Sequence, residues 1–140
     1  MSSNEPRGLC IDSQSGEPLP AAGGELLVGG PQTVGRLSAI HSTAPAGDSV
    51  PLHVHHQSDE CFYVLAGRYT VTCGLDTFEA GAGSFVYLPQ GVPHAYQLGD
   101  EPGRKLIIAV PAGLENFFRD MDSAHVDLDE LQHRHAITFL

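Results

Sequence analysis

The stretch GDSVPLHVHHQSDECFYVLAG, from Gly47 to Gly67, decides the fold, and GSFVYLPQGVPH, from Gly83 to His94, is its shorter partner. Side chains two residues apart in a β-strand project from the same face. His53 and His55 therefore present two imidazoles on one side of a strand, with Val54 on the other side. The pattern H-x-H in a strand is typical of a metal site.

Glu60 lies five positions after His55, a separation that would place it on the opposite face of an uninterrupted strand. The polar residues 56–59 are suited to a turn, so we expect Glu60 to open a second strand beside the first, in a hairpin whose inner faces share the site. Pro89, Gln90 and Gly91 predict a further tight turn. That turn delivers His94 from another strand.

These residues predict one mononuclear metal centre with His53, His55, Glu60 and His94 as ligands. Imidazole nitrogens and a carboxylate oxygen favour a divalent first-row transition ion, one per chain: Fe, Mn, Co, Ni, Cu or Zn. Four protein ligands leave coordination positions for water, dioxygen or a bidentate substrate. Glu60 is also the candidate catalytic general base toward a hydroxyl proton.

The composition is typical of one globular domain with an all-β core. The chain has 140 residues, 41% of them hydrophobic, and its 16 Gly and 10 Pro indicate many turns between short strands. We expect an N-terminal arm over residues 1–24, which lies on the body or on a neighbouring subunit, and a barrel over residues 25–110. Gly47, Gly67, Gly83 and Gly91 are interpreted as turn positions that need permissive backbone angles.

Residues 111–140 change to helical periodicity. Leu114, Phe117, Phe118 and Met121 predict one helix, and a second is expected to begin at Asp127 and to include Leu131 and His135. Both helices are expected to pack outside the barrel.

Charge and cysteine content exclude several classes of function. Seventeen acidic against seven basic residues give a formal charge of −10. The sequence has no cluster of Lys and Arg residues that could neutralise phosphates, so we expect no nucleic-acid partner. The sequence shows neither a leader pattern nor an apolar run of membrane-spanning length, so we expect a cytoplasmic protein without a membrane partner. Three cysteines, none in a C-x-x-C pair, predict reduced thiols.

Other residues leave alternatives open. His41 shares a strand face with Leu37 and Ala39, and it could either point toward the metal or form hydrogen bonds within the core; His56 has no assigned role. Alternating aromatic and apolar side chains could line a cavity for a flat ligand or simply fill the core: Phe62, Val64, Phe85, Tyr87 and Tyr96.

The two stretches resemble the motifs of the cupins, small jelly-roll β-barrels. Their first motif, G-x5-H-x-H-x4-E-x6-G, is met at Gly47, His53, His55, Glu60 and Gly67. Their second, G-x5-P-x-G-x2-H-x3-N, is met at Gly83, Pro89, Gly91 and His94, with Leu98 in place of the final Asn. The resemblance covers residues 25–110 and implies that His53, His55, Glu60 and His94 bind the metal.

The tail that opens PAGLENFF is similar to that of small bacterial cupins often described as quercetin-dioxygenase-like. The resemblance implies an enzyme that oxidatively cleaves or modifies a small polyphenol- or polyketide-like molecule. Two alternatives remain: a redox-neutral, metal-dependent polyketide cyclase or isomerase, and a non-catalytic cupin that binds a small ligand. The resemblance also implies a homodimer, formed through sheet edges and the N-terminal arm.

Overall fold

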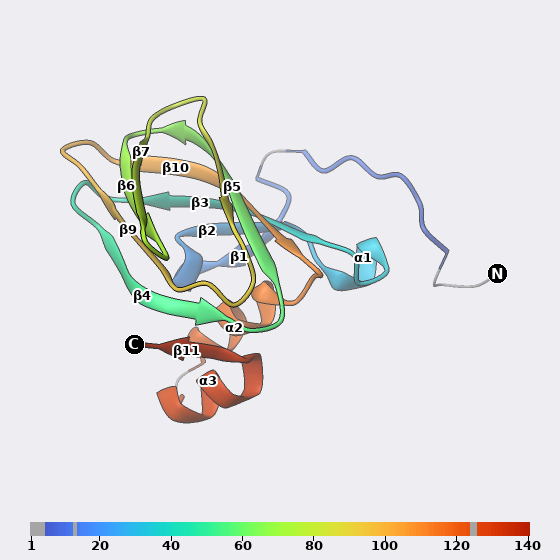
Figure 1. Cartoon of the computed structure of the whole chain (residues 1–140). Helices are drawn as coiled ribbons and strands as arrows, with labels where there is room; N and C mark the ends of the chain where they lie inside the picture. The colour runs from blue at the N-terminus through green and yellow to red at the C-terminus, as the bar shows by residue number, and fades with distance from the viewer. Residues whose placement is uncertain (1–4, 13, 124–125) are drawn as a thin grey trace.

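A computed structural model describes residues 5–12, 14–123 and 126–140, and it shows two antiparallel sheets that face each other (Figure 1). The predicted all-β architecture is confirmed. The six-stranded sheet has, in spatial order, β1 (Glu17–Leu19), β2 (Gly24–Val28), β3 (Ser38–Ala44), β10 (Gly103–Val110), β5 (Asp59–Ala66) and β8 (Phe85–Leu88). The five-stranded sheet has β11 (Ile137–Phe139), β4 (Ser49–His55), β9 (His94–Leu98), β6 (Tyr69–Cys73) and β7 (Asp76–Ala80).

The turn after His55 carries the chain from one sheet to the other. The sequence predicted that β4 and β5 form a hairpin, and this is wrong: β4 pairs with β9 and β11, whereas β5 pairs with β10 and β8. Their inner faces still share a site, because they face each other across the core instead of lying side by side in one sheet.

The core lies between the two sheets and follows the period of two along each strand. In β5, Glu60, Phe62 and Val64 are buried and alternate with more exposed neighbours. Tyr69 and Val71 of β6 close the core from the opposite sheet. Apolar burial of this kind is the main favourable contribution to folding.

The sheet begins earlier than the sequence indicates. Within the segment expected to be an arm, Glu17–Leu19 forms β1 and pairs with β2, and a short 3-10 helix, η1 (Pro20–Ala22), follows. The described residues before β1 extend away from the barrel (Figure 1); residues 1–4 and 13 of the expected arm lie outside the described residues. The predicted turn at Gly30 is a one-turn helix, α1 (Gly30–Thr33).

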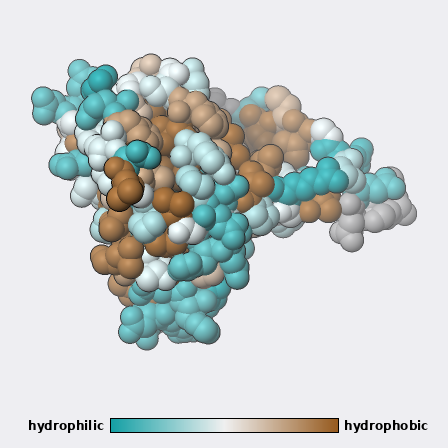
Figure 2. All heavy atoms as spheres, in the orientation of Figure 1, coloured by the Kyte–Doolittle hydropathy of each residue, from teal (hydrophilic) through white to brown (hydrophobic). Residues whose placement is uncertain are grey.

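The two C-terminal helices form as predicted. They are α2 (Leu114–Met121) and α3 (Leu128–His135), and the side chain of Asp127 caps α3 by accepting a hydrogen bond from the backbone N–H of Asp129. In Figure 2 the end of the molecule that carries α3 is hydrophilic, whereas hydrophobic atoms lie across the barrel. Neither helix has the length or apolar character of a membrane span.

A last strand, β11, was not predicted. It follows α3 directly and extends the five-stranded sheet by pairing with β4, with Ile137 opposite His55 and Phe139 opposite His53. The C-terminal segment therefore returns to the strand that carries two of the predicted ligands.

Candidate metal centre

Three strands bring the four predicted metal ligands together. His53 and His55 come from β4, Glu60 from β5 and His94 from β9. One nitrogen or oxygen atom from each residue lies within 4.8 Å of those of the other three. All four side chains are buried, with 1–7% of each residue exposed.

Local structure fixes how these side chains converge. The period of two places His53 and His55 on the inner face of β4, and His94 lies directly opposite His53 in the pairing of β4 with β9. The turn before His94 is attached to β4, because the backbone N–H of Gly91 donates to the carbonyl of His55 at 2.8 Å. A positive φ of 81° makes glycine the favoured residue there.

Burial favours the neutral form of His53 and His55, which is the form that binds metals. It lowers the pKa of His55 to about 4 and, together with the neighbouring imidazole of His94, also lowers the pKa of His53. Burial alone would raise the pKa of Glu60, but the neighbouring imidazoles, His94 above all, bring it below its ordinary value. Neutral imidazoles beside an ionised carboxylate are the protonation states that a metal requires.

Hydrogen bonding also fits a bound ion. The Nδ1–H of His53 donates to the carbonyl of Pro51 at 2.8 Å, which leaves the lone pair on Nε2. Glu60 Oε2 lies 3.1 Å from His94 Nε2 and 3.6 Å from His55 Nε2. The buried Glu60 Oε2 and His94 Nε2 nevertheless lack a well-directed hydrogen bond within the described chain.

Buried polar atoms without partners are costly, so their convergence needs an explanation. Ligands on opposite sides of one ion, with bonds of about 2.1 Å, lie roughly 4.2 Å apart. The four candidate ligand atoms lie within 4.8 Å of one another, which is close to that spacing. The residues therefore form a buried group that could hold one metal ion.

The C-terminal segment walls one side of this group. The ring of Phe139 on β11 lies 5.6 Å from that of His53. A cavity of about 220 Å³ reaches His55 between the turn after β4 and the two C-terminal helices. Its walls include Gln57, Asn116, Phe117, Arg134, His135 and Ile137.

Lys105 is a buried cation that sequence reasoning missed. It lies on β10 with 2% of the residue exposed, and its Nζ is 4.3 Å from the ring centroid of Tyr96 and 4.9 Å from that of Tyr69. Cations over aromatic faces are stabilised by the ring quadrupole. Alternation along β10 predicts that the side chain of Lys105 points inward. It does not predict that Tyr69 and Tyr96, from the other sheet, surround its ammonium group.

Several other candidate residues lie away from the centre. His41 is paired with Leu106 on the outer face of the six-stranded sheet, so it does not point toward the ligands. Phe85 and Tyr87 are 63% and 53% exposed on the outer face of β8, and the prediction that they could line the cavity is wrong. His56 lies in the turn after β4, where its Nε2 and Thr138 Oγ1 are 2.8 Å apart.

Comparisons with known proteins agree with this geometry. Residues 40–109, half of the chain, match a family model described as the cupin domain. A solved structure described as a predicted oxalate decarboxylase from Thermotoga maritima superposes with a TM-score of 0.59 over 62% of this chain and 77% of that chain. At 20% identity, this likeness shows the jelly-roll fold alone.

Two relatives have names that refer to chemistry. Quercetin 2,3-dioxygenase of Bacillus subtilis is 29% identical over 89 residues, which are 64% of this chain and 26% of that protein. Polyketide synthase CurC of Streptomyces cyaneus is 30% identical over 109 residues, which are 75% of this chain and 71% of that protein. The chain thus spans about a quarter of the length of the first relative and most of the second.

Proposed function

The chain belongs to the cupin domain family, and from that premise we propose that it is a mononuclear-metal enzyme that acts on a small polyphenol- or polyketide-like molecule as a dioxygenase. The observation that carries this proposal is the buried group of three histidines and one glutamate with unpartnered ligand atoms. The similarity to quercetin 2,3-dioxygenase favours dioxygen as the second substrate.

Residues of the chain would bind the metal, accept a proton and exclude water. His53, His55, Glu60 and His94 would hold a divalent transition ion, which supplies Lewis acidity toward substrate oxygens and, where redox-active, reactivity with dioxygen. Glu60, which is ionised, would accept a hydroxyl proton from the substrate, because the ion beside it would make that hydroxyl more acidic. Phe139 and Ile137 would exclude water from the side of β11.

A redox-neutral cyclase or isomerase is the second candidate. The match to polyketide synthase CurC favours it, because that match covers more of both proteins than the dioxygenase match does. The same four residues would hold the ion, and Glu60 would again act on a substrate proton. The two candidates differ in whether dioxygen is consumed.

The decisive experiment begins with the metal content of protein purified without added metal or chelator. We expect about one ion per chain in the wild type and in His56→Ala, a matched control whose histidine lies in the adjacent turn, and loss of the ion in His94→Ala. Redox-active metal together with dioxygen uptake on polyphenols supports the dioxygenase. Zinc without dioxygen uptake supports the cyclase or isomerase, and no metal in the wild type overturns both in favour of a ligand-binding protein.

A further inference from the structure

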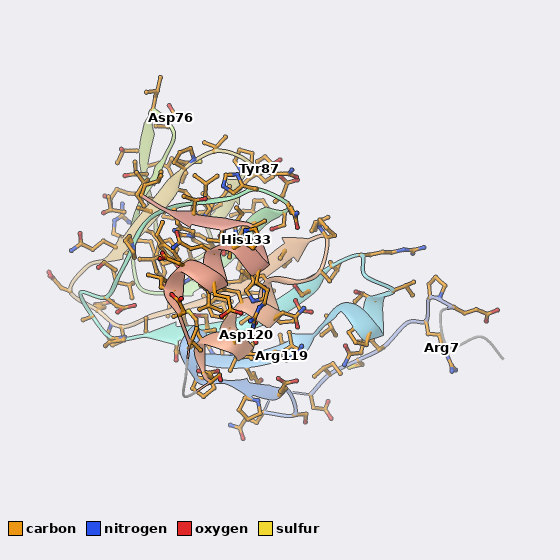
Figure 3. The ribbon with its side chains drawn as sticks, turned by 90° about the horizontal axis from the view of Figure 1, so that it is seen from below. Arg7, Asp76, Tyr87, Arg119, Asp120 and His133 are labelled. Carbon is orange, nitrogen blue, oxygen red and sulfur yellow. The ribbon has the colours of Figure 1, made fainter. Side chains whose placement is uncertain are left out.

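A hydrogen-bonded acid–histidine pair lies in the C-terminal segment, outside the match to the cupin domain. His135, the last residue of α3, has its Nε2 2.6 Å from Oδ2 of Asp120 on α2. Seen from below in Figure 3, Asp120 and the helix that carries His133 lie in front of the barrel. The same carboxylate accepts a hydrogen bond from Arg134 at 3.0 Å.

This pair shares a cavity with one of the four candidate metal ligands. His135 and His55 line the same cavity of about 220 Å³. The backbone explains their proximity, because Ile137 pairs with His55 only two residues after His135, and the N–H of His56 donates to the carbonyl of Ala136 at 2.9 Å. The side chain of His135 is 12% exposed, and the ring of Phe117 packs edge-on to it at 5.9 Å.

The chemistry of such a pair is specific. A carboxylate that accepts the Nε2–H of a histidine fixes its tautomer and leaves the lone pair on Nδ1. The same carboxylate stabilises the imidazolium that forms when Nδ1 takes a proton. Asp120 is suited to this role because hydrogen bonds with His135 and Arg134 lower its pKa, so it stays ionised.

We propose that Asp120 and His135 form a proton-transfer pair for a vicinal dihydroxy ligand, such as a catechol or an ene-diol, bound in this cavity. This inference rests on the proposed function. Such a ligand can bind a metal ion through two oxygens as a dianion, after both hydroxyl protons have left. Water takes the first proton, and His135 accepts the second: the O–H bond breaks, its electron pair stays on oxygen, and the proton forms an N–H bond at Nδ1.

The size and polarity of the cavity fit this class of ligand. Pockets for drug-sized ligands occupy roughly 300–1,000 Å³, so about 220 Å³ suits a single oxygenated ring. Polar side chains that form hydrogen bonds, such as Gln57 and Asn116, line it together with the ring of Phe117. His135 thus gives the site a proton acceptor that is not itself a metal ligand.

The test uses 4-nitrocatechol, whose absorption band distinguishes its singly and doubly ionised forms. Wild type, His135→Gln, Asp120→Asn and the control His133→Gln, which alters an exposed histidine on the same helix, are loaded with spectroscopically silent Zn²⁺. We expect the bound probe to lose its second proton at a pH at least one unit higher in His135→Gln, a tenfold change in proton affinity. Asp120→Asn should raise the pH of this second deprotonation by a smaller amount, and His133→Gln should titrate like the wild type.

The outcomes separate this proposal from the proposed function. If His135→Gln and Asp120→Asn bind zinc and the probe but titrate like the wild type, the proton-transfer pair is refuted while the metal centre stands. If the wild type binds the probe no better than His94→Ala does, the proposed function fails and the pair's role fails with it. Asp120→Asn keeps the imidazole, so it gives an answer even if His135→Gln does not fold.

Discussion

Lys105, the only lysine of the chain, makes stability depend on pH at the scale of a single residue. Burial lowers its pKa from 10.5 to about 8, although the charges of Glu60 and Asp48 oppose the shift. Between pH 8 and 10 the folded protein has released this proton while the unfolded chain still holds it. The contribution of Lys105 to the free energy of unfolding therefore rises with pH over that window.

Urea unfolding of wild type and Lys105→Met at several pH values measures this contribution. Methionine keeps much of the aliphatic volume without a titrating group, so the difference between the two proteins isolates Lys105 from the cysteines and tyrosines. From pH 8 to 10 we expect the wild type to gain on the order of 2 kcal/mol relative to the variant. Parallel pH profiles would show that the ammonium is not desolvated in the fold.

Residues whose role follows from local spacing could be predicted from the sequence. Gly47, Gly67, Gly83 and Gly91 were interpreted as turn positions, and each has a positive φ between 78° and 89°. The four ligand candidates converge as expected because strand alternation and turn chemistry are local properties. The Asp120–His135 pair could not be predicted, because it depends on how two helices pack and leaves no periodic signal.

At the scale of elements, buried Glu115 attaches α2 to the first residue of α1. Its Oε2 accepts the N–H of Gly30 and its Oε1 accepts the N–H of Gly113, both at 2.8 Å, and the residue is 1% exposed. Both bonds are charge-assisted and shielded from water, so each is stronger than an ordinary surface hydrogen bond. The carboxylate of Glu115 therefore holds the start of α2 in position against α1.

We predict that Glu115→Ala lowers the free energy of unfolding by about 1–3 kcal/mol, because it leaves two backbone donors unsatisfied. Glu115→Gln keeps one carbonyl acceptor and should fall between the variant and the wild type. Glu101→Ala, at an exposed acidic position, should change stability by less than about 0.5 kcal/mol. Chemical denaturation measures all three, and equal effects of Glu115→Ala and Glu101→Ala would contradict the assignment.

The elements that the sequence missed are those with little local signal. β1 and β11 have three residues each and α1 has four, too few for a period to emerge. The assignment of β4 and β5 to one hairpin failed for a different reason. A short turn between two alternating segments is compatible with pairing in one sheet or with a crossing between facing sheets, and packing of the whole core decides which occurs.

At the scale of the whole molecule, the outer face of the six-stranded sheet is unusually apolar for a surface. Five of its large side chains are 38–63% exposed: Tyr63, Leu65, Phe85, Tyr87 and Val110. Register places Phe85 beside Tyr63 on neighbouring strands, so at least these two side chains adjoin on this face. Contiguous apolar patches commonly mark interaction surfaces.

We propose a second copy of the chain as the partner for this face. Each chain carries a formal charge of −10, so two copies repel one another except where charges are sparse. A two-fold axis would place the same apolar patch on both sides of the contact. The N-terminal residues that extend away from the barrel expose Leu9 and Ile11 by 48% and 38%, and they could reach a neighbour (Figure 1).

We therefore predict that the homodimer implied by the family resemblance forms through this outer face, with the edge strand β8 at its rim. Sedimentation equilibrium should give twice the chain mass of 14.9 kDa for the wild type and the single-chain mass for Tyr87→Glu. Leu75→Glu is the matched control, because Leu75 is fully exposed on the turn between β6 and β7 in the other sheet. The face is excluded as the interface if Tyr87→Glu stays dimeric or if Leu75→Glu dissociates equally, since a general increase in negative charge would then explain the loss.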